Sequence, residues 1–381
     1  MKLYSNRAGG LYHVQSNYDC FVPKSLYEIV INIDEEMNYL INESNFLLGK
    51  IDGVAVNLPD RDIFISMYVE KEAVVSSQIE GTQASLSDVL QKNSTEKKKE
   101  TEEIVNYVHS LNYGIELMES LPLSIRFLRE IHKELLKGVR GEHKNPGELR
   151  HSQNWIGPSG CSLSDASFVP PSVDKMIEAL NDLELYMNDE TKIPSLLKIA
   201  LIHYQFETIH PFLDGNGRLG RLLIILWLKY YNFLNYPLLY LSLYFKQNRS
   251  EYYSLLMDVR TKGRYEEWIK FFLKGIIEIS KNSIETISKI TLVKEDVLNK
   301  INNLKVKNKN TYYDVINYLF KHPYFSSSDL IDEFKFTKPT SSKIINELIL
   351  LDIVKPTSNK QRYVIYRFDK YVDILENGTN I

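Results

Sequence analysis

The chain has 381 residues, of which 44% are hydrophobic, and this favours an ordinary globular protein of two or three domains. Its net charge of −3 argues against a mainly electrostatic nucleic-acid binder, although a single domain could still be basic. No apolar run approaches a membrane span, the start does not resemble a signal peptide, and Cys20 and Cys161 lack any metal-site spacing, so we expect a cytosolic protein with free thiols.

Helical periodicity dominates the first three hundred residues. Apolar residues recur at three- and four-residue steps, which predicts helices over 25–41, 62–81, 104–118, 124–138 and 195–209. In 155–176, short apolar pairs flank a Gly/Ser/Asp-rich tip, which predicts a short β-hairpin followed by a helix that starts after Pro170-Pro171. The charge run 93–103 predicts a solvated loop and helix start between an N-terminal and a central helical region.

The pattern changes after the Lys/Asn-rich stretch 302–310, which we interpret as a linker. The following segments predict three helices and then two strands joined by a turn at Thr357 to Lys360. Helix, helix, helix and hairpin is the order of a winged helix-turn-helix.

The third of these helices has the features of a recognition helix. Thr337 can cap it, Pro339 falls in its first turn, and Ser341, Ser342 and Lys343 lie where such a helix would meet a groove. The region has only a small excess of basic residues. DNA binding and a protein-contact or dimerisation role are therefore equally open.

The stretch HPFLDGNGRLGR, residues 210–221, carries the most distinctive chemistry. It ends the helix predicted over 195–209, because Pro211 cannot continue the helical ladder. Its three glycines let the backbone turn tightly, and a new helix is expected to start near Asn216. Free N–H groups at a helix N-terminus, reached through a glycine-rich turn, form an anion site suited to phosphate.

Four side chains of this stretch complete a candidate site. Arg218 and Arg221 share one face of the new helix's first turn, where two cations are unfavourable unless an anion lies between them. Asp214 offers a hard oxygen ligand for Mg²⁺, and His210 can take a proton from an attacking hydroxyl near neutral pH. These are the parts of a phosphoryl or nucleotidyl transfer site. His203 precedes His210 by two helical turns, but no third ligand in register supports zinc.

Residues 210–221 resemble the Fic-family signature HPFxDGNGRxGR at every specified position. Fic proteins are mostly enzymes that transfer AMP from ATP to a hydroxyl side chain of a target protein. The resemblance implies an all-α Fic core with a short β-hairpin flap, plus a C-terminal winged helix-turn-helix domain (α+β), which also occurs in one branch of the family. It implies an N-terminal helical region with an inhibitory motif over 1–95, a catalytic core over 96–300, and a linker and winged helix over 301–381.

The resemblance also implies a role for each residue of the signature. His210 would be the general base and Asp214 the Mg²⁺ ligand. Arg218 would contact the α and β phosphates of ATP, and Arg221 the γ phosphate. The residues expected to bind the nucleotide are Gly215, Asn216, Gly217, Arg218, Leu219, Gly220 and Arg221.

Two further segments resemble parts of the family. The segment from Pro146 to Pro171 is similar to the one that carries the flap, a hairpin that pairs with the target's backbone, and it contains Arg150, Ile156 and Gly157. Residues 248–253, NRSEYY, are similar to a stretch whose tyrosines lie near the adenine, here Tyr252 and Tyr253. From their pattern alone, these tyrosines could equally form an aromatic helix face packed in the core.

A second motif, SSQIEGT at residues 76–82, ends the helix predicted over 62–81. Gly81 takes the place of a C-terminal cap, so Glu80 would lie at the negative end of the helix dipole, where a carboxylate needs a cation unless it is solvated at the surface. The motif resembles the inhibitory motif [S/T]xxxE[G/N] of Fic proteins, with Ser76 first and Glu80 as the acid. The resemblance implies that Glu80 pairs with Arg221 and keeps the γ phosphate from docking.

We therefore expect a protein adenylyltransferase that uses ATP and Mg²⁺, is autoinhibited by Glu80, and acts on a Ser, Thr or Tyr hydroxyl of an unknown target. Self-modification, AMP removal and homo-oligomerisation stay open, and no membrane partner is expected. One alternative is phosphoryl transfer or transfer of another nucleotide, although Gly217 stands where kinase-like Fic relatives place a lysine. Another is a DNA-binding regulator that uses the Fic fold as a nucleotide sensor.

Overall fold

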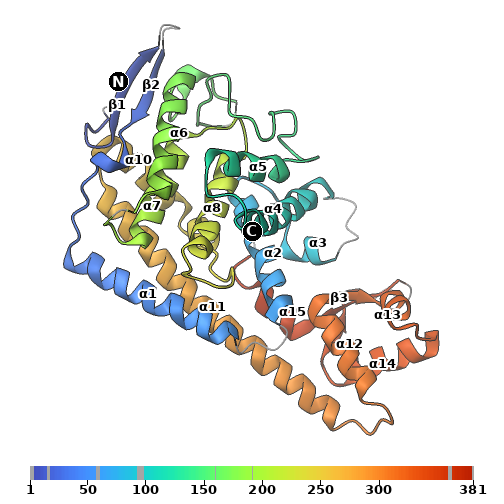
Figure 1. Cartoon of the computed structure of the whole chain (residues 1–381). Helices are drawn as coiled ribbons and strands as arrows, with labels where there is room; N and C mark the ends of the chain where they lie inside the picture. The colour runs from blue at the N-terminus through green and yellow to red at the C-terminus, as the bar shows by residue number, and fades with distance from the viewer. Residues whose placement is uncertain are drawn as a thin grey trace.

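The computed structural model describes residues 4–14, 18–56, 61–91, 98–158, 160–190, 192–358 and 363–379. Within these ranges the protein is mostly helical, with a two-stranded hairpin near the N-terminus and a three-stranded sheet near the C-terminus (Figure 1). No helix in the described part of the chain is both long enough and apolar enough to cross a membrane.

The long helices surround a buried central pair. The helices up to residue 302 are α1 (Glu35–Val56), α2 (Arg61–Ile79), α3 (Leu86–Leu90), α4 (Lys98–Leu117), α5 (Ile125–Leu135), α6 (Val173–Asn188), α7 (Ser195–Ile209), α8 (Asn216–Tyr230), α9 (Ser242–Gln247), α10 (Arg249–Lys262) and α11 (Tyr265–Asn302). Nearly every side chain of α7 and α8 is buried, as expected of helices that are enclosed on all sides. The loop between these two helices carries residues 210–215.

Four of the five predicted helices are confirmed as α2, α4, α5 and α7, and α7 has the predicted bounds. The helix predicted from residue 25 differs, because α1 begins only at Glu35. The carboxylate of Asp34 accepts the N–H of Met37 at 2.8 Å and caps the helix there. Leu26–Glu28 forms a separate 3-10 turn, and Ile29 is extended.

A hairpin of β1 (Gly9–Val14) and β2 (Tyr18–Pro23) corrects the expectation that the first three hundred residues are nearly all helical. Its alternation of apolar residues is weak, because the neighbouring Cys20 and Phe21, which point to opposite faces of β2, are both buried. The N–H of Phe21 donates to the carbonyl of Val169, which ties the hairpin to the segment before α6. Tertiary contact therefore stabilises strands that local pattern does not predict.

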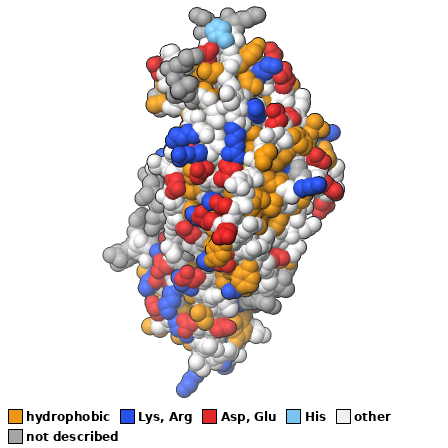
Figure 2. All heavy atoms as spheres, turned by 90° about the vertical axis from the view of Figure 1, so that its left-hand side faces the viewer, with side chains coloured by type: hydrophobic (Ala, Val, Ile, Leu, Met, Phe, Trp, Pro, Cys, Tyr) orange, Lys and Arg blue, Asp and Glu red, His pale blue; other side chains and the backbone are white. Residues whose placement is uncertain are grey.

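Helix α1 lies along the 38-residue α11 (Figure 1). Lys270 of α11 pairs with Asp34 and Glu36, and Lys281 pairs with Glu43, so ion pairs line the edge of an apolar seam. Figure 2 shows this side of the molecule, on which acidic and basic side chains are mixed and hydrophobic side chains gather along one flank. The seam joins the N-terminal region to the rest of the core.

The C-terminal region contains α12 (Asn310–Lys321), β3 (Tyr324–Ser326), α13 (Ser327–Phe334), α14 (Lys338–Leu350), β4 (Val354–Pro356), β5 (Ile365–Phe368) and α15 (Asp369–Glu376). Its antiparallel sheet has the strand order β3-β5-β4. The predicted order of three helices and two strands is present, and β3 and α15 are additions. Residues 359 and 360 of the predicted turn lie outside the described residues.

Two predictions about α14 have different outcomes. The hydroxyl of Thr337 accepts the N–H of Thr340 and caps the helix as expected, with Pro339 in the first turn. Ser341, however, is completely buried and its hydroxyl bonds Ser327, because α14 packs this face on α13. Only Ser342 and Lys343 of the predicted groove-facing group are exposed.

Candidate active site

The candidate site is built on the sharp connection between α7 and α8. His210 closes α7 with φ 51° and ψ 60°, in the left-handed region that is unusual for a residue other than glycine. Gly215, with φ 77°, precedes α8 and occupies the same region without strain. The side chain of Asn216 closes the loop by accepting the N–H of Phe212 and donating to its carbonyl.

His210 is suited to accept a proton. Burial lowers its pKa to about 4, and the charges of Arg150 and Arg260 act in the same direction. The imidazole is therefore neutral at pH 7. Its Nδ1 is buried and has no hydrogen-bond partner within the described residues, so this nitrogen stays available to a ligand or a fixed water.

Asp214 and Arg218 lie beside each other at the start of α8. The carboxylate of Asp214 is about one-third exposed, and its Oδ1 lies 3.4 Å from the Nη2 of the Arg218 guanidinium. Arg218 is buried and also lies 3.6 Å from Glu103 of α4, yet its Nε and Nη1 make no hydrogen bond in the described part of the chain. Buried guanidinium donors without partners indicate a site for an anion.

Arg221 is held by the end of α2. Its Nη2 donates to the Oε1 of Glu80 and to the carbonyl of Ser76, and its Nε donates to the Ser76 hydroxyl, all at 2.9 Å. Burial by itself would raise the pKa of Glu80, but the charge of Arg221 and its hydrogen bond, together with Arg218, outweigh burial and lower it. Glu80 is therefore a carboxylate that forms a salt bridge with a buried arginine.

Glu80 also occupies the N-terminus of α8. A Cβ atom built on Gly217 would lie 2.2 Å from the Oε1 of Glu80 and 3.0 Å from Arg221, so only glycine allows this approach. The first N–H groups of a helix have no partner inside the helix, and they attract anions. The Glu80 carboxylate therefore lies where a phosphate would be expected. Gly81 follows with φ 95°, as the predicted cap.

The remaining predicted nucleotide residues separate into surface and core positions. Tyr253 is 41% exposed and lies beside Arg249, whereas Tyr252 is 1% exposed, stacks on Phe245 and bonds His203 at 2.9 Å. Only Tyr253 is accessible to a ligand. Leu219 is fully buried, and Gly220 faces Glu207 and Phe206, so both belong to the interior of α8's packing.

The predicted flap is less regular than a hairpin. Ile156 and Phe168 form one pair of backbone hydrogen bonds, of 2.9 and 3.0 Å, and no longer ladder is present among the described residues of this segment. The indole of Trp155 donates to the carbonyl of Cys161, and Gly157 packs against the Cys161 side chain. The two arms of the predicted β-hairpin are therefore paired, but only through the single antiparallel bridge of Ile156 and Phe168.

Several site residues were missed from sequence. Glu207 lies one turn before His210, is buried, and burial raises its pKa to about 7. Glu103 is buried against Arg218, although the charge run 93–103 predicted a solvated segment; residues 93–97 of that run lie outside the described ones. His132 and Asn154 contact the catalytic loop through its backbone. Backbone recognition leaves no sequence signal, so only the burial of a polar residue could have suggested these roles.

The site offers several groups that could bind the phosphates of ATP and one accessible carboxylate that could bind Mg²⁺. Phosphate oxygens suit the Nε and Nη1 of Arg218, which make no hydrogen bond among the described residues, and the N-terminus of α8, which the Glu80 carboxylate covers here. In the described part of the chain no cluster of three His, Cys, Asp or Glu side chains forms a protein-only metal site. Asp214 is the accessible carboxylate at the phosphate end, and Mg²⁺ usually binds one or two carboxylates together with substrate phosphates.

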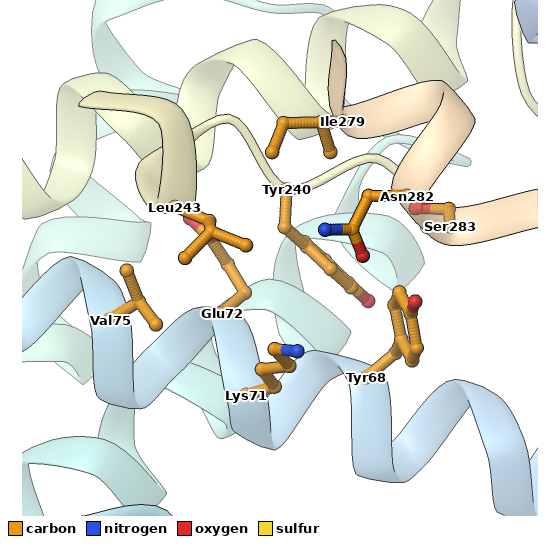
Figure 3. A pocket seen from close by; sticks show the side chains of 9 residues that line it. All are labelled: Tyr68, Lys71, Glu72, Val75, Tyr240, Leu243, Ile279, Asn282 and Ser283. Carbon is orange, nitrogen blue, oxygen red and sulfur yellow. The ribbon is translucent and has the colours of Figure 1, made fainter. Parts of the chain in front are cut away.

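A small cavity, with a volume of about 20 Å³, borders α2 (Figure 3). It lies between α2, the start of α9 and α11, and its lining includes Lys71, Glu72 and Asn282. Glu72 is buried, and burial raises its pKa to about 7. Its Oε1 accepts from Tyr107 of α4 and Ser242 of α9, which ties α2, the helix that precedes Glu80, to both of these helices.

Comparison with known proteins agrees with this geometry. Residues 39–116 match the sequence profile of the Fic/DOC family N-terminal region, and residues 122–228 match that of the Fic/DOC family. Over 166 residues the chain is 29% identical to protein adenylyltransferase fic-1 of Caenorhabditis elegans, covering 43% of this chain and 29% of the relative. Over 247 residues it is 26% identical to protein adenylyltransferase Fic of Drosophila grimshawi, covering 64% and 46%. The chain thus spans less than half of these relatives' length.

Solved structures share the fold. A Fic family protein from Desulfovibrio desulfuricans superposes with a TM-score of 0.58 at 20% identity, over 89% of this chain and 97% of that one. A Fic domain containing signaling protein from Bacteroides thetaiotaomicron gives 0.51 at 18% identity, over 65% and 97%. At these identities the likeness concerns the fold alone.

Proposed function

Because this chain belongs to the Fic/DOC family, we propose that it is a protein adenylyltransferase that transfers AMP from ATP to a hydroxyl side chain of a target protein and is autoinhibited by Glu80. One observation carries the proposal: the Glu80 carboxylate occupies both the Arg221 guanidinium and the N-terminus of α8, the two groups that would hold a phosphate. The curated relatives named above are adenylyltransferases.

The proposed reaction uses His210 as the base. The neutral imidazole takes the proton of the target hydroxyl, whose oxygen attacks the α phosphorus of ATP. The bond from that phosphorus to the bridging oxygen breaks, pyrophosphate leaves, and AMP remains on the target. Arg218 and the N–H groups of Asn216 and Gly217 stabilise charge on the phosphate oxygens.

Asp214 would hold Mg²⁺ beside the phosphates. When bound, the ion neutralises phosphate charge and orients the leaving group. The carboxylate itself is positioned for this by the loop, since its Oδ1 accepts the N–H of Gly215 at 2.6 Å. Adenine would lie on the side of the exposed Tyr253.

Inhibition follows from competition for one cation. Arg221 is 2% exposed and already has three hydrogen bonds to Ser76 and Glu80. A γ phosphate cannot use the same guanidinium edge until the carboxylate moves away. We therefore propose that ATP binds productively only after the end of α2 shifts.

The test uses labelled ATP and two variants. Glu80→Gly is expected to raise AMP transfer or self-modification at least tenfold, because it removes the competing carboxylate, and adding His210→Ala is expected to abolish transfer. Equal modification with Glu80 intact or replaced would contradict autoinhibition. Transfer of the α label identifies AMP transfer, whereas transfer of the γ label would identify phosphoryl transfer.

Glu80 could have a second role in removing AMP. The test modifies a protein with the Glu80→Gly variant and then adds the wild type. If the wild type strips AMP while the His210→Ala variant does not, the site catalyses both the transfer of AMP and its hydrolytic removal. Retention of AMP in both samples would limit the protein to transfer.

We also propose that the C-terminal region is a winged helix and that residues 1–95, 96–300 and 301–381 form the three functional regions. The order α12, β3, α13, α14, β4, β5 supports the winged helix, and the exposed Ser342 and Lys343 on α14 support DNA contact. A salt-dependent mobility shift that disappears in Lys343→Glu would favour a DNA-binding regulator. An intracellular target, self-modification and homo-oligomerisation remain part of the proposal.

A further inference from the structure

The loop of residues 210–215, which we call the catalytic loop, is held by donors that bind its backbone carbonyls. Asn154 donates from its amide nitrogen to the carbonyls of His210 and Phe212, at 3.0 and 2.9 Å. Arg150 donates its Nε to the His210 carbonyl at 3.0 Å and its backbone N–H to the Pro211 carbonyl at 2.9 Å. We call residues 147–154, which contribute these donors, the strap.

The strap is anchored at its other end as well. The N–H of Gly147 donates to the Nδ1 of His132 at 2.9 Å, which leaves the proton on Nε2 to donate to the Asp214 carbonyl at 2.9 Å. The ring of His132 also stacks on Phe212 with its centroid 3.8 Å away. Three buried or half-buried side chains therefore fix the loop carbonyls at positions 210, 212 and 214, and the backbone N–H of Arg150 fixes the one at position 211.

The backbone of His210 requires such support. A left-handed conformation is costly for a residue with a Cβ atom and persists only where the surroundings hold it. The His210 carbonyl receives two donors, from Arg150 and Asn154, and Arg150 is 1% exposed. Because the strap continues directly into Ile156, the same residues connect the proposed base to the segment that would contact the target.

We propose that Asn154 and Arg150 are positioning residues, which hold the left-handed backbone of His210 and make the strap, the flap segment and the general base one unit. The inference rests on the proposed AMP transfer and concerns the geometry of the base rather than nucleotide affinity. The phosphate groups would be held by α8 and its arginines. The Asn154 amide donates to the carbonyls of His210 and Phe212 and not to these groups.

The test compares two changes of the same chemistry. Asn154→Asp keeps the shape but replaces the donor with an oxygen that repels two carbonyls. Asn188→Asp is the matched control, because the Asn188 amide also donates to two carbonyls, those of Leu123 and Glu184 at 2.8 Å, and these lie outside the strap and the catalytic loop. Both are made in the Glu80→Gly variant, with thermal unfolding and circular dichroism as checks of folding.

Asn154→Asp is expected to lower kcat about 10- to 100-fold, as a small displacement of a catalytic group does, with the KM for ATP changed less than about threefold. Asn188→Asp is expected to leave both constants unchanged. Equal kcat values for the two variants, or a KM for ATP that rises as much as kcat falls, would overturn the inference. If Glu80→Gly transfers no more AMP than its His210→Ala derivative, the proposed function fails instead.

A second readout does not depend on transfer. The ring signals of labelled histidines are recorded by NMR, and the His210 signal is assigned by its loss in His210→Ala. Asn154→Asp is expected to shift or broaden the His210 signal while leaving His203 in place, because His203 bonds Gly220 and Tyr252 and not the strap. An unchanged His210 signal in Asn154→Asp would refute the positioning role whatever the transfer assay shows.

Discussion

At the scale of residues, the site combines polar groups that burial forces into defined states. Arg221 has ordered partners, Arg218 has two guanidinium nitrogens that make no hydrogen bond among the described residues, and His210 is neutral. The sequence motif predicted which residues meet, because the signature is contiguous along one loop. It could not predict Glu207, His132 or Asn154, since their contacts depend on how distant helices pack and are mostly with backbone atoms.

Buried neutral histidines make the fold sensitive to acid. Burial lowers the pKa of His203 to about 3, below its unfolded value near 6.5. Between these values the unfolded chain binds more protons, so stability falls as pH falls below about 6.5. We expect this histidine to cost about 2 kcal/mol of unfolding free energy between pH 7 and pH 5.

Denaturant unfolding at both pH values checks this expectation. His203→Gln should reduce the difference in unfolding free energy between pH 7 and pH 5 by about 2 kcal/mol. The control His151→Gln concerns a histidine whose side chain is 79% exposed, and it should leave the difference unchanged. The same pH difference in wild type and His203→Gln would show that His203 is not neutral by burial.

At the scale of elements, α2 presents Glu72, Ser76 and Glu80 at four-residue steps along one face. Ser76 gives Arg221 two of its three hydrogen bonds, one from the hydroxyl and one from the carbonyl. Ser76→Ala leaves Nε of Arg221 unpaired in a buried place, which costs about 1–3 kcal/mol and weakens the inhibited state. We expect AMP transfer to rise about 5- to 100-fold, less than in Glu80→Gly.

Ser77→Ala is the neighbouring control. The Ser77 hydroxyl is equally buried but has no hydrogen-bond partner within the described residues, so its loss should not change transfer. If Ser77→Ala activates as strongly as Ser76→Ala, general loosening of α2 rather than the Arg221 contact explains the effect.

Elements with strong periodicity were predictable, and those that depend on tertiary contact were not. Helix α7 has its predicted bounds because Pro194 and Pro211 limit an apolar segment. The β1–β2 hairpin, β3 and α15 were missed because each is stabilised by segments far away in the chain. The flap was predicted as a hairpin from its turn residues, but side-chain contacts around Cys161 compete with strand pairing.

At the scale of the whole molecule, the C-terminal region returns to the helix that carries the inhibitory motif. Helix α15 packs on α11 and α2 (Figure 1), with Tyr371, Val372 and Leu375 buried. The ammonium of Lys71 on α2 donates to the carbonyl of Asn377 at 2.6 Å, and Lys71 also lines the cavity beside α2 (Figure 3). The position of α2 therefore depends in part on contacts with the C-terminal region.

A chain that ends after Phe368 is expected to have a lower unfolding temperature, because it exposes the apolar surface that α15 covers. With Glu80 intact it should also transfer AMP faster, since α2 loses support before the residues that hold Arg221.

Lys71→Met removes only the hydrogen bond to Asn377 and should give a smaller rise in AMP transfer without loss of the fold. In the Glu80→Gly variant neither change should raise transfer further, because the inhibitory carboxylate is already absent. A rise of the same size in that variant would show that α15 acts on catalysis by another route than α2.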